Sequence, residues 1–446
     1  MSVRTAIIGL GVTGYSCLRY LAGEDELLVL DTRDAPPYGA AAQAGWPGVD
    51  YRFGAAACDA PFAGVDRVVV SPGVGLDHPL VRRAVAAGAA VVSDIDLFCQ
   101  AARAPIYAIT GTNGKSTVTA LAGHLLEALG RHPGVGGNLG EPALGLLAEP
   151  RDCYVLELSS FQLERMAGYG FHAAALLNVT EDHLDRHGSL AAYTASKRRI
   201  FRGAHRAVAN RDDPLTLPDS AVDELLTFGL DAPAPGHWGL RRIDGAQTLC
   251  RGDEALMRLA DLPLAGMHNG LNVLAACALV AADAPLGNPS GSELAAAVAG
   301  FRGLPHRCQR VAEVAGVAFV DDSKATNVGA ALAALAGLGG SRPSLILIAG
   351  GDGKGADFAP LADPVRRYVK SVVLLGRDAP LLQRALQGAA PITRVADMSQ
   401  AVSAAMAAAA PGDTVLLSPA CASLDMYRDY AARGEAFAAA VEALGA

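Results

Sequence analysis

The stretch Ile106-Tyr107-Ala108-Ile109-Thr110-Gly111-Thr112-Asn113-Gly114-Lys115-Ser116-Thr117 decides the fold of the chain around it. Its apolar first half predicts a buried strand, and a helical pattern opens at Lys115 and stops at Gly130. Between the two, Gly111 and Gly114 let backbone N–H groups turn toward an anion. The stretch therefore predicts a strand, a phosphate-binding loop and a helix.

The side chains at the end of this loop suit a nucleotide. Lys115 supplies a point charge for β- and γ-phosphates, and the Ser116 hydroxyl can ligate Mg²⁺. Ile109 takes the place of the first glycine of the full Walker pattern, so the match to that pattern is incomplete. A glycine turn before a helix, with no ligand, is the alternative interpretation.

Length and composition limit the classes of protein to which this chain can belong. The chain has 446 residues, enough for two or three domains, with 51% apolar and 18% charged residues. Its net charge of −8 argues against nucleic acid or an anionic membrane as the main partner. The eight cysteines form no Cys-x-x-Cys pair, no 18 apolar residues run uninterrupted, and the first residues show no cleavage-site pattern. We therefore expect a cytoplasmic protein without membrane insertion, disulfide framework or zinc site.

A second glycine turn lies near the N-terminus. A predicted strand at Thr5–Ile8 leads into Gly9–Gly14, a Gly-x-Gly-x-x-Gly pattern, and the next strand, Leu27–Leu30, ends at Asp31. A third strand, Arg67–Val70, runs into the turn Ser71-Pro72-Gly73. The pattern is typical of a dinucleotide-binding unit, and from these residues alone a nicotinamide cofactor remains open.

Carboxylates and histidines follow two predicted strands in the middle of the chain. Cys153–Glu157 ends in a carboxylate, which is either a Mg²⁺ ligand or a cap for the helix after it. Ala173–Leu177 leads into Asn178–His187, whose density of His, Asp and Glu predicts a second ion or a phosphate-handling site. A helix over Tyr193–Phe201 carries Lys197, and the segment 230–264 gives no clear pattern.

The last third alternates strands and helices, with polar turns at strand ends. The predicted strands are Val317–Val320, Ser344–Ala349, Ser371–Leu375 and Thr414–Leu417. Ligands of such sheets bind at the carboxyl ends of the strands. The fold class predicted is α/β in three domains: a Rossmann-like N-terminal domain (1–103), a central P-loop ATPase-type domain (104–303) and a C-terminal Rossmann-like domain (304–446).

Eight motifs, spread over essentially the whole chain, resemble those of the Mur ligases. They lie at Ala108–Thr117, Glu157–Glu164, Asn178–Asp185, Gly266–Asn272, Leu304–Arg307, Asp322–Asn327, Gly350–Lys354 and Ser418–Asp425. The resemblance is greatest to members that add D-glutamate to UDP-N-acetylmuramoyl-L-alanine. It implies ATP-driven amide synthesis through an acyl phosphate, in the assembly of peptidoglycan precursors.

The resemblance also implies roles for single residues. The ATP-binding set would be Gly111, Thr112, Asn113, Gly114, Lys115, Ser116, Thr117, Asn272, Arg307 and Asp322. Ser116 and Glu157 would hold one Mg²⁺ and His183 a second, with Lys197 carbamylated as its partner. The catalytic set would be Lys115, His183, Lys197 and Asn138, the last touching the muramoyl substrate.

Two further sets complete what the resemblance implies. Uridine diphosphate would lie on Val12, Thr13, Asp31, Thr32, Arg33, Ser71, Pro72 and Gly73, which reassigns the first glycine turn from a nicotinamide cofactor. The incoming amino acid would lie on Lys324, Thr326, Lys354, Ser423, Leu424 and Tyr430. A monomer is expected.

Other functions stay open at this point. Another amide ligase, such as folylpolyglutamate synthase or a Mur ligase for a different amino acid, is the nearest alternative. A non-enzymatic nucleotide-binding regulator and a nicotinamide dehydrogenase are alternatives of other classes. The glutamate stereochemistry rests on family analogy alone, because two lysines and a serine can hold either enantiomer.

Overall fold

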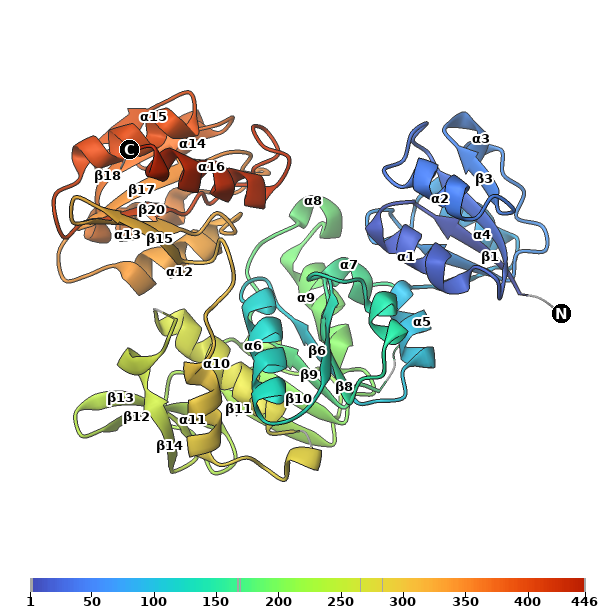
Figure 1. Cartoon of the computed structure of the whole chain (residues 1–446), viewed down its shortest axis with the longest axis horizontal. Coiled ribbons are helices and arrows are strands. Elements are labelled where there is room, and N and C mark those ends of the chain that lie inside the picture. The colour runs from blue at the N-terminus through green and yellow to red at the C-terminus, as the bar shows by residue number, and fades with distance from the viewer. Residues whose placement is uncertain (1–2, 167, 169, 265, 283, 445–446) are drawn as a thin grey trace.

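The computed structural model describes residues 3–166, 168, 170–264, 266–282 and 284–444, which form three α/β lobes in chain order (Figure 1). Each lobe is built on its own sheet, of five, nine and six strands. The strands of each sheet come from one of the three segments that the sequence predicts as domains, and the boundaries between those segments stay predictions.

The N-terminal sheet is entirely parallel, in the order β3-β2-β1-β4-β5. Its strands are β1 (Arg4–Ile8), β2 (Glu26–Asp31), β3 (Asp50–Phe53), β4 (Arg67–Val70) and β5 (Ala90–Val92), and its helices are α1 (Val12–Leu21), α2 (Gly39–Gly45), α3 (Ala55–Cys58), α4 (Pro79–Ala86) and α5 (Asp94–Ala101). Because β1 lies between β2 and β4, the glycine turn after β1 is flanked by Asp31 and Ser71. The three strands predicted here are confirmed; β3 and β5, short and partly exposed, were not predicted.

Helix α5 ties the first lobe to the second. A capping box of Ser93 and Asp96 starts the helix. Its apolar side belongs to the same core as β6 and β8, and the rings of Phe98 and Tyr154 meet edge to face with centroids 5.0 Å apart. The two lobes therefore share packed apolar contacts as well as a chain connection.

The central sheet has the order β14-β13-β12-β11-β10-β9-β6-β8-β7. Its strands are β6 (Ile106–Thr110), β7 (Pro133–Gly137), β8 (Cys153–Glu157), β9 (Ala173–Leu176), β10 (Arg206–Asn210), β11 (Glu224–Phe228), β12 (Trp238–Ile243), β13 (Ala246–Arg251) and β14 (Glu254–Arg258). Its helices are α6 (Lys115–Ala128), α7 (Ser160–Leu163), α8 (Leu184–His187), α9 (Leu190–Arg198), α10 (Met267–Val280) and α11 (Gly291–Ala299), with 3₁₀ turns η1 (Ala143–Ala148), η2 (Arg199–Phe201), η3 (Pro214–Thr216), η4 (Leu259–Asp261) and η5 (Ala284–Leu286). Strand β6 is buried along its whole length, so the phosphate loop leaves the sheet from its interior.

The segment without a clear sequence pattern forms an antiparallel extension of this sheet. Strands β12, β13 and β14 pair in succession, and β12 also joins β11 in parallel through Phe228 and Trp238. The alternation typical of half-exposed strands is broken in β12, which buries its first three residues and continues with Arg241, Arg242 and Ile243. Such short mixed runs escape a period-two search.

The C-terminal sheet has the order β15-β16-β20-β17-β18-β19, with only β15 antiparallel. Its strands are β15 (Gln309–Val314), β16 (Val317–Asp321), β17 (Leu345–Gly350), β18 (Val369–Leu375), β19 (Ile392–Arg394) and β20 (Thr414–Leu417), and its helices are α12 (Val328–Leu338), α13 (Ala362–Tyr368), α14 (Ala379–Ala385), α15 (Met398–Ala408) and α16 (Tyr430–Glu442), with one 3₁₀ turn, η6 (Ala359–Leu361). The four strands predicted here are confirmed. Because β16, β20 and β17 are parallel neighbours, the three polar turns after them share one edge of the sheet.

No helix in the described part of the chain is long and apolar enough to span a bilayer.

Candidate functional site

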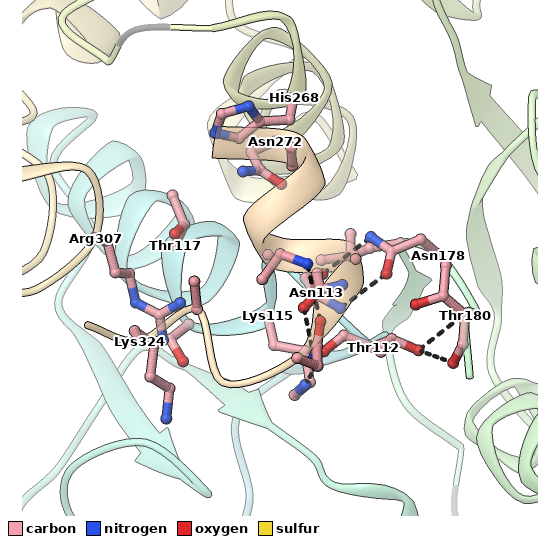
Figure 2. Close-up of a pocket in the computed structure, with 18 of the residues that line it drawn as sticks. Thr112, Asn113, Lys115, Thr117, Asn178, Thr180, His268, Asn272, Arg307 and Lys324 are labelled. Atoms are coloured by element: carbon pink, nitrogen blue, oxygen red, sulfur yellow. Dashed lines mark hydrogen bonds between the residues drawn. The ribbon is translucent and has the colours of Figure 1, made fainter. Parts of the chain in front are cut away.

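The phosphate loop is held open by its neighbours. Gly114 caps α6 with φ +82°, and a Cβ there would lie 2.5 Å from Asn272 Oδ1, so both conformation and space require glycine. Asn178 supports the loop from the end of β9: its Oδ1 accepts from the Asn113 N–H at 2.8 Å and its Nδ2 donates to the Asn113 carbonyl at 3.0 Å (Figure 2). The backbone of the loop is therefore preorganised.

Lys115 bends back over the loop. Its Nζ donates to the carbonyls of Gly111 at 2.9 Å and Thr112 at 2.8 Å (Figure 2). Burial lowers its pKa, with Glu157 acting in the opposite direction. A phosphate oxygen is a stronger partner for an ammonium group than a neutral carbonyl, so the side chain is placed to turn toward an anion.

Glu157 presents a carboxylate oxygen with no partner at the end of β8. The side chain is 2% exposed; Oε1 accepts from Asn138 Nδ2 at 2.7 Å, whereas buried Oε2 has no hydrogen-bond partner. A buried carboxylate oxygen needs a partner, and Ser116 faces the same cavity. Carboxylate and hydroxyl oxygens are hard donors, so this pair fits a magnesium ion. Among the described residues no three His, Cys, Asp or Glu side chains cluster as a preformed metal centre.

Lys197 is the most deeply buried cation near the loop. It is 1% exposed, its Nζ donates to the Gly111 carbonyl at 2.7 Å, and the same atom lies 4.5 Å from the centre of the Tyr193 ring. Burial, followed by the nearby charge of Lys115, holds the pKa of Lys197 well below its usual value. A solvated surface lysine is thereby excluded.

His183 and Asp182 stand together after β9. His183 adopts φ +53°, its backbone N–H is bonded to Asp182 Oδ1 at 2.9 Å, and its ring packs edge-on against Phe161 with centroids 5.0 Å apart. Asp182 also accepts from two groups of the third lobe, Lys354 Nζ and Asn327 Nδ2, each at 3.2 Å. Asp182 is therefore a contact between the second and third lobes, a role that the sequence did not predict.

The third lobe brings cations to the loop. Arg307 and Lys324 face the cavity (Figure 2), and Lys324 Nζ lies 3.9 Å from the centre of the Tyr430 ring. Burial and the charge of Arg307 lower the pKa of Lys324 to about 8. Burial raises the pKa of Asp322 to about 7, although Ser418 Oγ donates to it at 2.8 Å.

These groups line one cavity of about 550 Å³ between the second and third lobes. The predicted residues that line it are Thr112, Asn113, Gly114, Lys115, Ser116, Thr117, Asn138, Glu157, His183, Lys197, Asn272, Arg307, Asp322, Lys324 and Thr326. Gly111 lies beneath its floor as the acceptor for two lysines. The lining residues without a predicted role include Ser159, Phe161, Asn178, Asp182, Tyr193, His268 and Asn269.

Four residues of the predicted amino-acid set do not line this cavity. Lys354 and Tyr430 border it through Asp182 and Lys324. Ser423 is buried in the turn after β20, and Leu424 is 71% exposed.

The predicted uridine-diphosphate residues gather at the first glycine turn, away from the cavity. Asp31 accepts from the Leu10 N–H at 2.8 Å and from Arg33 Nη2 at 2.6 Å, while Ser71 Oγ donates to the Gly9 carbonyl at 2.7 Å. Burial opposes ionisation of Asp31, but the hydrogen bonds from Arg33 and Leu10 leave its pKa lowered. Both oxygens of Asp31 are occupied. Arg33 is about half exposed and donates to Asp31 through Nε and Nη2, so Nη1 is its nitrogen available to a ligand.

The fold and the site define a class of nucleotide-dependent enzymes with three lobes. The central lobe carries the phosphate loop, and a Rossmann-like lobe precedes and follows it in the chain. Three family descriptions match in order: a Mur ligase MurD-like N-terminal domain over residues 3–93, a Mur ligase middle domain over 109–280, and a Mur ligase glutamate ligase domain over 306–421. The chain belongs to the Mur ligase family.

Curated relatives match over nearly the whole chain. A UDP-N-acetylmuramoylalanine--D-glutamate ligase of Marinobacter nauticus is 49% identical over 99% of this chain and 98% of its own. The protein of the same name from Pseudomonas aeruginosa is 49% identical over 98% and 97%. Among solved structures, the UDP-N-acetylmuramate-alanine ligase of Thermotoga maritima has a TM-score of 0.61 at 20% identity, covering 99% of each chain, which shows the shared fold.

Proposed function

We propose that this chain adds D-glutamate to UDP-N-acetylmuramoyl-L-alanine at the expense of ATP, in cytoplasmic peptidoglycan precursor synthesis. The observation that carries the proposal is the single cavity in which the phosphate loop, the unpartnered Glu157 oxygen and the third-lobe cations meet. Relatives named for this reaction are 44–49% identical over almost the full length. A phosphate loop, a carboxylate oxygen suited to a cation and several positive side chains in one cavity support an ATP-driven ligase.

The reaction proceeds in two displacements. A carboxylate oxygen of the alanine attacks the γ-phosphorus, and the bond to the bridging oxygen breaks, which gives an acyl phosphate and ADP. The glutamate amine then attacks the acyl carbon, the carbon–oxygen bond to phosphate breaks, and the amine loses a proton. Exchanging the hydroxyl leaving group for phosphate makes amide formation downhill in water.

The residues of the cavity counter the repulsion between the reacting anions. Lys115 exchanges its carbonyl partners for phosphate oxygens, and Arg307 and Lys324 approach from the opposite side. Fixed positive charge in a site shielded from water stabilises a developing phosphoryl charge strongly.

Two magnesium ions complete the proposed site. Glu157 and Ser116 would hold one, and His183 with a modified Lys197 would hold the second. Bound Mg²⁺ neutralises phosphate charge and polarises the reacting oxygens. Asn138 keeps the Glu157 carboxylate in place through its 2.7 Å hydrogen bond to Oε1, and Oε2, which has no hydrogen-bond partner, would be the oxygen that binds the ion.

Lys197 is proposed to be carbamylated. Burial lowers the pKa of Lys197 and so favours its neutral amine. The amine nitrogen bonds to the carbon of CO₂, one carbon–oxygen π pair becomes the carboxylate charge, and the nitrogen loses a proton. His183 and the carbamate would together hold a Mg²⁺ ion, whose charge would stabilise the product. Carbon NMR of the enzyme in ¹³C-bicarbonate with Mg²⁺ should show a carbamate signal that is absent from Lys197→Met.

The substrates are proposed to enter from two sides. Uridine diphosphate occupies the first glycine turn, with Arg33 meeting the ligand. The carboxylates of glutamate bind to Lys324, Thr326 and Lys354. The proposed pocket is bordered by Ser423, Leu424 and Tyr430. In the structure, Lys354 pairs with Asp182. To bind glutamate, Lys354 must leave the Asp182 carboxylate and pair with a carboxylate of the substrate. The monomer is proposed to be the active unit, since no residue from a second copy is needed.

Phosphate release from ATP, Mg²⁺ and UDP-N-acetylmuramoyl-L-alanine, with D-glutamate, L-glutamate or neither, tests the proposal. Release that depends on D-glutamate is expected. Preference for L-glutamate would overturn the pocket assignment, and inactivity of folded protein with every amino acid would overturn the function.

A further inference from the structure

Arg165 joins the first lobe to the second at a point away from the reacting groups. It follows α7, its side chain is fully buried, and its guanidinium donates to two backbone carbonyls, those of Phe161 in its own lobe and Val74 in the first lobe. The contact to Val74 crosses 91 positions of sequence. Burial lowers the pKa of Arg165, with Glu164 acting in the opposite direction.

Glu164 fixes this guanidinium and a second one. Its Oε1 lies 3.0 Å from Arg165 Nη1 and 2.6 Å from Arg186 Nη2. The Arg186 guanidinium carbon lies 5.5 Å from the centre of the Phe161 ring, and a Cβ on Gly75 would stand 3.2 Å from Arg186 Nη1. We call Glu164, Arg165 and Arg186 the interlobe clamp.

Both ends of the clamp lead to sites already described. On one side, the Val74 N–H donates to the Ser71 carbonyl at 2.9 Å, and Ser71 Oγ donates to the Gly9 carbonyl at 2.7 Å, so the position of Val74 sets the turn Ser71–Gly73 and the first glycine turn. On the other side, Phe161 lines the cavity and packs against His183.

We propose that Arg165 is a positioning residue for the UDP-linked substrate, through the interlobe clamp. The substrate must reach from the first glycine turn to the carboxylate site at Glu157 and His183, so its affinity depends on the distance between the two lobes. Arg165 fixes that distance by holding Val74 to Phe161. This inference rests on the proposed function, because it takes the first glycine turn as the uridine-diphosphate site.

Arg199 provides a matched control. It donates to the carbonyls of Leu163, at 2.7 Å, and Met166, so it holds the same segment by the same kind of contact. It lies in the second lobe, at the start of η2, and its hydrogen bonds given for the described residues stay in that lobe, although the charge of Asp96 in α5 acts on it. A loss of general stability in this segment affects both arginines, whereas the loss of the hydrogen bond to Val74 affects Arg165 alone.

The test compares Arg165→Met, Arg165→Lys and Glu164→Gln with Arg199→Met, all in the full chain. The KM for UDP-N-acetylmuramoyl-L-alanine should rise at least about tenfold in Arg165→Met, as the loss of a charged hydrogen bond between lobes would produce, with the KM for ATP within about twofold of wild type. Arg165→Lys keeps the charge but loses the forked guanidinium that reaches two carbonyls. Its KM for the UDP-linked substrate should therefore lie between those of the wild type and Arg165→Met. Arg199→Met should lower the Tm without changing either KM by more than about twofold.

An unchanged KM for the UDP-linked substrate in Arg165→Met, or an equal rise in Arg199→Met, overturns the inference. If Arg165→Met does not fold, Arg165→Lys and Glu164→Gln decide by the same ratio of KM values. Calorimetric titration with the UDP-linked substrate distinguishes failure of the clamp from failure of the proposed function. Absence of binding to the wild type would refute the uridine site itself. Equal binding to the wild type and the variants would refute only the clamp.

Discussion

The two glycine turns of this protein have the same backbone plan and different chemistry. Each follows a parallel strand and opens a helix. The first, Gly9–Gly14, runs into the first turn of α1, whose N-cap is Gly11, and the second, Gly111–Gly114, precedes α6. In the first turn, the Asp31 carboxylate accepts a hydrogen bond from the Leu10 N–H, and the nearest cation, Arg33, is half exposed. In the second, an amide side chain supports the loop, and two lysines lie against the Gly111 carbonyl.

This difference explains why one turn suits binding and the other suits reaction. A diphosphate that only has to be held can lie near solvent on amides and one arginine. A γ-phosphate that must accept a second anion needs several cations in a site shielded from water, because opposite charges interact more strongly there. The turns are distinguished by what surrounds them, and the predictions below separate the two roles.

The largest effect should come from the reacting turn. Lys115→Met removes the ammonium that donates to two carbonyls of the loop. Phosphate release should fall by on the order of 10³-fold, the usual cost of losing a group that stabilises transition-state charge. Calorimetric binding of the UDP-linked substrate should be unchanged, because the proposed site of that ligand is the other turn. Activity within tenfold of wild type would refute the role of Lys115.

A smaller effect should come from the binding turn. Arg33→Met should raise the KM for the UDP-linked substrate by about tenfold, because one charged hydrogen bond is lost, and leave the KM for ATP unchanged. Arg52→Met is the control, since Arg52 pairs with Asp50 by the same two-residue spacing on β3 in the same lobe. Equal effects in Arg33→Met and Arg52→Met would remove Arg33 from the uridine site.

Lys324 should give the reaction a pH dependence. With a pKa of about 8 it is charged at neutral pH and loses its proton as the pH rises through 8. The KM for D-glutamate should therefore rise between pH 7 and 9.5. Lys324→Arg keeps its charge across that range, so the inflection near pH 8 should vanish and only the titration of the substrate amine should remain. A wild-type profile that coincides with that of Lys324→Arg would contradict the prediction.

The smallest effect on activity is expected at the contact between the lobes, where the change is in stability. Burial raises the pKa of Asp94 to about 6, and its Oδ1 has no hydrogen-bond partner. Because the folded state holds the proton more tightly than the unfolded state, the stability from Asp94 is full below about pH 4 and is lost as the pH rises through 6, by on the order of 2–3 kcal/mol.

Asp94→Asn cannot ionise and should therefore avoid this loss. Its Tm should exceed that of the wild type at pH 8, by a margin that shrinks toward pH 4.5 in thermal scans. Asp96, the capping-box partner of Ser93, offers a contrast: Asp96→Asn should lower the Tm at pH 8, because Asp96 accepts from the Ser93 N–H and hydroxyl, both at 2.8 Å. A lower Tm for Asp94→Asn than for the wild type at pH 8 would contradict the prediction.

The sequence by itself determined the strands next to glycine turns and the residue types of the site. The phosphate loop, Glu157 at the end of β8 and the polar turns of the last lobe are local patterns, since a buried strand, a turn and a helix are each specified by neighbours in the chain. Strands β12 and β19 escaped because neither shows a period-two pattern: β12 buries its first three residues in a row, and β19 has only three residues, two of them exposed.

Tertiary structure alone decided how these pieces meet. Lys197 has an ordinary sequence setting, beside Arg198 and Arg199, and only packing against Tyr193 and the phosphate loop buries its amine. The contacts of Asp182 with the third lobe, and of Arg165 with Val74, likewise join segments more than 90 positions apart. Such contacts follow from the docking of separate lobes, which no local pattern encodes.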